Sequence, residues 1–156
     1  MPIEWIDIGA VQVAAQPVGL WTLAQDFVPG GRLLRISVLA HDHENQPVER
    51  TWKPAATLEC GPDGILADTP RTSLLCTSAL YGALIGKIGG ATSDVPDLTP
   101  NAPPYANKRV FAAGSEVIVP LGTSDGGPLF LTMNDSPEGF AMHSGELLVR
   151  LQYYPT

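Results

Sequence analysis

The chain has 156 residues, enough for one domain with a continuous core that needs no metal or disulfide support. Hydrophobic residues make up 44% and charged residues 16%, which excludes an intrinsically disordered chain. The formal net charge of −7, with only nine Lys and Arg, argues against nucleic acid as a partner. We therefore expect one globular domain over residues 1–156.

The sequence gives no sign of a membrane anchor or of a secretion signal. No stretch reaches the roughly 18 consecutive apolar residues of a spanning helix. The start, MPIEWIDIG, lacks the basic residues and apolar run of a signal peptide. We expect a protein without a membrane span, cytoplasmic as synthesised, and exported, if at all, by a route without a signal peptide.

Glycine (16) and proline (15) separate short apolar runs along the whole chain, as is typical of all-β proteins. The expected strands, in chain order, are VGLWTLAQDFV (18–28), RLLRISVLAH (32–41), EVIVPL (116–121), PLFLTMN (128–134) and GELLVRLQYY (145–154). In the last of these, Leu147, Val149 and Leu151 share one face, which we expect to meet the core. Arg150 lies on the opposite face.

Two long segments between the strands have no regular apolar period. Residues 41–70 carry four prolines and predict an excursion at one end of a sandwich, and residues 89–109 form a second such loop. Loops of this length tend to carry function. Between the two loops, SALYGALIGKIGG (78–90) fits a helix or a pair of strands, and its glycines at 82, 86 and 89 favour the strands.

The two cysteines, Cys60 and Cys76, do not predict a disulfide framework or a metal knuckle. Small apolar neighbours such as Leu74 and Leu75 favour buried thiols. A disulfide between the two cysteines remains an alternative if the protein works outside the cell.

Two stretches, ALYGALIGKIG (79–89) and LTMNDSPEGFAMHSGELLV (131–149), resemble motifs of the LecA (PA-IL)-like galactose-binding lectins, small calcium-dependent bacterial proteins. The similarity extends from about Val18 to Leu151. It implies an all-β fold, a two-sheet antiparallel β-sandwich of the jelly-roll, galactose-binding-like kind. It also implies a homo-oligomer, because members of this family are often oligomeric.

The resemblance further implies where an ion and a sugar would bind. In the family, calcium is held by the Asp of an Asn-Asp pair, by a Thr, by two Asn residues and by a main-chain carbonyl. Here Asn134 and Asp135 are kept, whereas the Thr position is Gly139 and the Asn positions are Met142 and His143. Gly and Met offer no side-chain oxygen to calcium.

Two family positions that contact the sugar fall on Thr69 and Thr72. A threonine hydroxyl can hydrogen-bond a sugar, with a shorter reach than the residues it replaces. The galactose preference of the family therefore does not transfer directly.

The segment HDHE (41–44) and His143 fall in the same implied neighbourhood. If the preceding strand continues to Glu44, its two histidines point to one side. Zinc or another transition metal on His43, His143 and Asp135 is one alternative. Calcium on Asp135, on Glu44 or Asp42, and on main-chain carbonyls is a second. The third alternative has no metal. In it, HDHE is the solvated start of a loop, His143 is an exposed turn residue, and the methionine before it fills the place of the ion.

Aromatic residues are candidates for a sugar platform. Trp52 lies in the proline-rich excursion, where it either faces a ligand or covers the small core of that loop. Trp21 is expected in the core, and Phe140 is left open between the two orientations. Trp5 and Tyr105 are further candidates.

No catalytic signature is present: the chain lacks a G-x-S-x-G elbow, an H-E-x-x-H helix and the lysine of a phosphate loop. We expect a non-catalytic, lectin-like module that binds a glycan or a glycosylated surface through hairpin 134–144, HDHE and the threonines at 69 and 72. The alternative is a degenerate lectin-fold scaffold for protein contacts or self-assembly, which the loss of oxygen ligands at 139 and 142 motivates.

Overall fold

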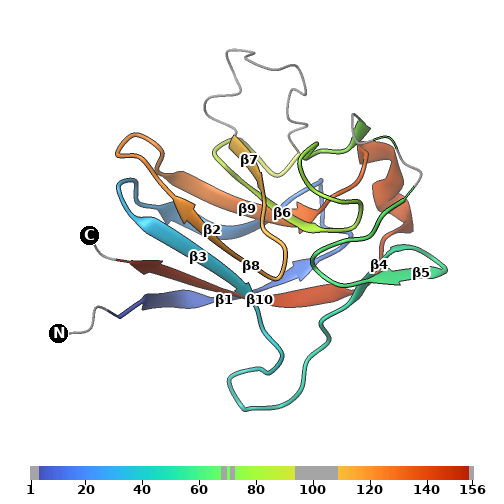
Figure 1. The fold of residues 1–156 in the computed structure, drawn as a ribbon, viewed down its shortest axis with the longest axis horizontal. Coiled ribbons are helices and arrows are strands. Elements are labelled where there is room, and N and C mark those ends of the chain that lie inside the picture. The colour runs from blue at the N-terminus through green and yellow to red at the C-terminus, as the bar shows by residue number, and fades with distance from the viewer. Residues whose placement is uncertain (1–3, 68–69, 71–72, 94–108, 155–156) are drawn as a thin grey trace.

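The expected antiparallel β-sandwich is confirmed. The computed structural model describes residues 4–67, 70, 73–93 and 109–154. Two four-stranded sheets form its layers, sheet A in the order β1-β10-β3-β8 and sheet B in the order β2-β9-β6-β7 (Figure 1). All pairings in both sheets are antiparallel.

Five strands, β2, β3, β8, β9 and β10, agree closely with the predicted apolar runs, whereas β4, β5 and the start of β7 lie where loops were expected. Sheet A contains β1 (Ile6–Ala14), β3 (Leu33–Val38), β8 (Glu116–Pro120) and β10 (Glu146–Tyr154). Sheet B contains β2 (Thr22–Val28), β6 (Leu84–Ile88), β7 (Arg109–Ala112) and β9 (Gly127–Met133). The excursion after β3 holds a small sheet of β4 (Trp52–Ala55) and β5 (Leu58–Cys60). A 3-10 helix, η3 (Pro137–Met142), precedes β10. The expected hairpin at residues 134–144 is not a β-hairpin, because β9 lies in sheet B and β10 in sheet A, so this segment connects the two sheets; the name hairpin is kept for it below.

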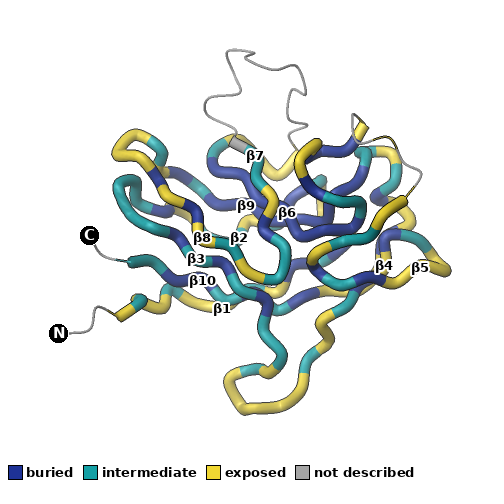
Figure 2. The backbone as a smooth tube through the Cα atoms, viewed as in Figure 1, coloured by how far each residue is buried: buried dark blue, intermediate teal, exposed yellow. Residues whose placement is uncertain are grey.

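The space between the sheets is filled by the inward faces of the strands (Figure 2). On β10 the predicted alternation is confirmed, since Leu147, Val149 and Leu151 are at most 1% exposed. Burying a side chain of this size contributes about 1.5–3 kcal/mol. Trp52 also belongs to this core at 1% exposed, so it covers the core and does not face a ligand.

A second apolar cluster covers the outer face of sheet B. It includes Trp21, confirmed as a core residue, together with Phe130 and Phe140. Lys87 is fully buried beneath it, with Nζ 4.9 Å from the centroid of Trp21 and 4.8 Å from that of Phe130. The ammonium group also donates a 2.6 Å hydrogen bond to the carbonyl of Ala91, so its charge is compensated within the fold.

Residues 78–90 form one strand and a turn, where a pair of strands was expected. The strand interpretation is confirmed for β6 only. Before it, the chain turns at Gly82 with φ +81°, and a Cβ there would approach the Cys60 sulfur at 2.6 Å. The carbonyl of Gly82 accepts a 2.8 Å hydrogen bond from the Trp52 indole. This turn therefore joins the small sheet to sheet B.

β1, the edge strand of sheet A, was not among the predicted strands. Its apolar alternation changes phase between Ile8 and Val11, because a bulge between Asp7 and Gly9 inserts one residue into the pairing with β10. The bulge turns the next outward residues, including Gln12, over the outer face of sheet A. No helix among the described residues is long and apolar enough to cross a bilayer.

Candidate functional site

Asn134, at the end of β9, is fully buried and hydrogen-bonded throughout. Its Oδ1 accepts from the Cys76 N–H at 2.9 Å. Its amide nitrogen donates to the carbonyls of Cys76, Ala79 and Leu80 at 2.9, 3.2 and 3.1 Å. An amide has two N–H donors, so three carbonyls use its full capacity. Asn134 therefore fastens segment 76–80 to the hairpin and has no donor left for a ligand.

Asp135 and His143 form a buried pair across the hairpin. Their side chains are 6% and 0% exposed, and Nε2 of His143 lies 2.8 Å from Oδ2 of Asp135. Nδ1 lies 2.8 Å from the carbonyl oxygen of Ala15, which can only accept, so Nδ1 carries a proton. Between Nε2 and the carboxyl group the two residues share one further proton. The pair is neutral as a unit, which removes most of the cost of burying a charge.

Gly139 makes this pairing possible. A Cβ at this position would overlap Oδ2 of Asp135, the atom that meets His143. The other carboxyl oxygen accepts a 2.6 Å hydrogen bond from the N–H of Ser136. The glycine thus lets the Asp135 carboxyl turn inward over η3, where both of its oxygens find donors within the chain.

The structure corrects the expected arrangement of the hairpin. His143 is buried, not an exposed turn residue, because both ring nitrogens have partners and its ring lies 4.5 Å from that of Phe140. Met142 fills no internal site, since 57% of it is exposed. Phe140 faces inward at 5% exposed. The buried side chains of Asp135, Phe140 and His143 therefore fill the interior of the hairpin.

The residues present do not fit the calcium ion that the resemblance implies. Calcium takes about six to eight oxygens. Asp135 is already bonded to His143 and to the N–H of Ser136, and neither Gly139 nor Met142 adds a side-chain oxygen. Among the described residues, no group of three or more His, Cys, Asp and Glu side chains is placed to hold a metal ion.

His43 and Glu44 lie in a different region from the hairpin. β3 ends at Val38, so HDHE forms a turn instead of the expected strand extension. The side chains of His43 and Glu44 are 89% and 71% exposed, with 3.6 Å between Nε2 and Oε1. In Figure 1 this loop extends below the sheets, away from η3. His43 and His143 do not share an ion site, because the side chain of His143 is fully buried, that of His43 is exposed, and no metal-ligating group of described residues joins them.

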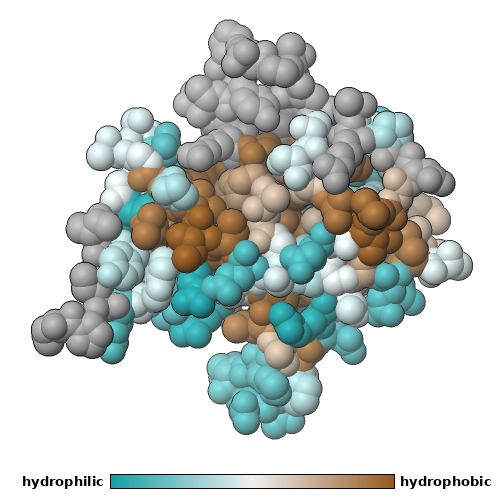
Figure 3. All heavy atoms as spheres, in the orientation of Figure 1, coloured by the Kyte–Doolittle hydropathy of each residue, from teal (hydrophilic) through white to brown (hydrophobic). Residues whose placement is uncertain are grey.

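The loop that carries HDHE is held in one shape by Asp42. Its Oδ1 accepts from the N–H groups of Glu44 and Gln46, both at 2.9 Å. The backbone closes the loop at its neck, where the N–H of Val48 donates to the carbonyl of Ala40 at 3.0 Å. Figure 3 shows that this loop has a hydrophilic surface, whereas hydrophobic residues gather elsewhere on the same face.

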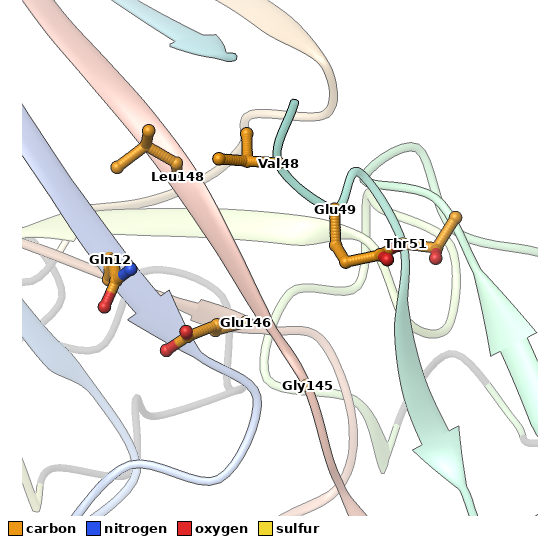
Figure 4. Close-up of a pocket in the computed structure, with 7 residues that line it drawn as sticks. All are labelled: Gln12, Val48, Glu49, Thr51, Gly145, Glu146 and Leu148. Atoms are coloured by element: carbon orange, nitrogen blue, oxygen red, sulfur yellow. The ribbon is translucent and has the colours of Figure 1, made fainter. Parts of the chain in front are cut away.

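A groove lies between this loop and the outward faces of β1 and β10; we call it the strand-loop groove. One lobe, of about 290 Å³, is lined by Gln12, Glu49, Thr51 and Glu146 above Val48 and Leu148. The second lobe, of about 680 Å³, shares Gln12, Val48 and Leu148 and extends to Asp7, His41 and Arg150. Figure 4 shows Gln12 and Glu146 together on one side of the smaller lobe and Glu49 beside Thr51 on the other.

The described residues contain no activated nucleophile in this region. Both nitrogens of His143 are engaged, so it cannot act as a general base. Cys60 and Cys76 are buried free thiols, as predicted. Burial raises the pKa of Cys60 to about 11, which keeps it protonated and unreactive at neutral pH. Burial, and then the Asp135 carboxylate, also raise the pKa of Tyr81.

Some predicted site residues lie outside the described part of the chain. They are Thr69, Thr72 and Tyr105. Of the remainder, Asn134, Asp135 and His143 come together within the hairpin, and His43 and Glu44 lie in the loop. The groove residues Gln12 and Glu146 were not predicted. Glu146 could have been found, because it belongs to the set of alternate residues on β10 that faces away from the core.

Comparison with solved structures places this sandwich among lectin-like folds. The N-terminal domain of EclA, described as a PllA-like lectin, superposes with a TM-score of 0.55 over 94% of this chain and 97% of that domain. The sequence identity is 13%, so the similarity concerns the fold. No family model matches the chain, and no curated protein matches it.

Proposed function

We propose that the chain is a non-catalytic carbohydrate-binding module of the LecA-like kind that binds its glycan without a metal ion. The observation that carries the proposal is the lectin-like fold, which matches nearly the whole length of both chains. Because a fold hosts many functions, the sugar must be recognised by this chain's own residues.

The closed hairpin supports the metal-free part of the proposal. In it, Asp135 has both oxygens satisfied by His143 and by the N–H of Ser136. Opening that pair to admit an ion would leave a buried imidazole without its partner. The hairpin then acts as a structural brace, and the glycan contacts fall on other surface residues.

A glycan array probed with the labelled chain, once in EDTA and once in calcium, tests this proposal. We expect binding to at least one saccharide at equal strength in both buffers. Binding only in calcium would contradict the metal-free mechanism. A blank array at millimolar sensitivity would contradict carbohydrate binding and favour the scaffold alternative.

A further inference from the structure

We propose that the strand-loop groove is the saccharide site of this module and that it takes a neutral saccharide chain. The inference rests on the proposed carbohydrate function and adds to it the place and the class of ligand. It differs from the hairpin site that the family resemblance implies.

The smaller lobe of the groove combines an apolar part with polar side chains. Val48 and Leu148 lie together at one end of the smaller lobe, and Gln12, Thr51 and Glu146 line the rest of it (Figure 4). A pyranose ring has the matching surface, with an apolar face of C–H groups and a rim of hydroxyls. The Gln12 amide can donate to and accept from such hydroxyls, and the Glu146 carboxylate can accept. The Thr51 hydroxyl donates to Glu59 at 2.7 Å, so toward a sugar it can only accept.

The walls of the groove are fixed before a ligand arrives. On the sheet side, Gln12 lies directly opposite Leu148 in the antiparallel register of β1 and β10. On the loop side, the Asp42 carboxylate fixes the tip and the bond between Val48 and Ala40 fixes the neck. A preformed site avoids the entropy cost of ordering a loop, which matters for a weakly held ligand such as a sugar.

The charges along the groove favour a ligand without negative charge. Glu49 and Glu146 both line the smaller lobe, and neither makes an ion pair in the described part of the chain. In the larger lobe, Arg150 lies 3.5 Å from Asp7, so its charge is already matched. A sialylated or uronic saccharide would meet repulsion here, whereas a neutral one would meet hydrogen-bond acceptors.

The groove follows the outward row of β10 from Glu146 to Arg150. Gln152, only 8% exposed, separates the groove from an aromatic pair. Tyr154, at the far end of the strand, meets Trp5 edge-on with ring centroids 5.3 Å apart. At ~3.4 Å per residue, the lining stretch from Glu146 to Arg150 spans about 14 Å. This length suits a short saccharide chain better than a single monosaccharide.

Titration of the ¹⁵N-labelled protein with soluble oligosaccharides tests the inference. The panel contains neutral hexose and N-acetylhexosamine chains with their sialylated and uronic counterparts. We expect amide shifts at Gln12, Leu148 and Arg150 with neutral chains, and at least tenfold weaker binding of acidic ones. In Gln12→Ala and Glu146→Ala, affinity for the neutral chain should fall at least tenfold, while Glu138→Ala on η3 serves as the matched control and leaves it unchanged.

The outcomes separate the inference from the proposed function. Saccharide binding that survives Gln12→Ala and Glu146→Ala, or shifts confined to residues 134–144, would overturn the groove and leave the carbohydrate function standing. Preference for acidic chains would overturn the ligand class. Absence of binding to every saccharide would overturn both the function and the groove.

Discussion

The hairpin at residues 134–144 and the loop at residues 39–51 both carry polar residues that a sequence reader would assign to a ligand, but the structure uses them differently. In the hairpin, Asn134, Asp135 and His143 are buried and bonded to one another or to the backbone. In the loop, His43 and Glu44 are exposed, and His43 lines the larger lobe of the strand-loop groove. The same residue types thus serve stability in one region and remain available to solvent in the other.

The largest expected effect contrasts a histidine from each region. His143→Ala leaves the Asp135 carboxyl buried without its partner, and we expect a loss of about 3–5 kcal/mol in the free energy of unfolding. His43→Ala removes an exposed side chain and should change it by less than about 0.5 kcal/mol. Urea denaturation measures both variants, and equal losses would contradict the assigned difference between hairpin and loop.

A pair of glycines gives the next effect. In Gly139→Ala the new methyl group meets Asp135 Oδ2, and we expect a loss of about 1–3 kcal/mol from overpacking. Gly61→Ala is the control, because its nearest neighbour would be the carbonyl oxygen of Arg50 at 3.9 Å. Thermal unfolding followed by circular dichroism should show a lower Tm for the first variant only.

A smaller effect is expected at the tip of the loop. Asp42→Ala removes the acceptor for two backbone N–H groups at an exposed site, which should cost about 1 kcal/mol. Hydrogen exchange at the amides of Glu44 and Gln46 should become faster. Glu44→Ala is the control, and exchange at these amides should not become faster in it, because the Asp42 carboxylate is still present. Equal acceleration in both variants would contradict the assignment of the turn to Asp42.

The smallest expected effect is that of added ions. An ion that binds only the folded chain must raise the Tm. Because the hairpin carboxyl is already paired, we expect calcium, zinc or nickel to shift the Tm of EDTA-treated protein by less than about 1 °C. A rise of several degrees with any of them would show that the hairpin can open to a metal.

The fold could be predicted to the extent that its apolar residues alternate without interruption. β10 was predicted because Leu147, Val149 and Leu151 keep one phase, and β1 was missed because its bulge changes the phase between Ile8 and Val11. The candidate site was harder to predict. Histidine occurs both in solvated turns and in buried pairs. Only the positions of Ala15 and Asp135 around His143 decide between the two.

The glycine at position 139 also limits which amino-acid substitutions this protein can tolerate. Threonine there would place a Cβ on the carboxyl group that His143 holds, so regaining that one oxygen ligand first destabilises the fold. Replacing His143 with asparagine first would break the buried pair instead. The two substitutions are therefore epistatic, and each is expected to be tolerated only in the presence of the other. A mutational path toward an ion-binding hairpin must cross a less stable intermediate or take both steps together.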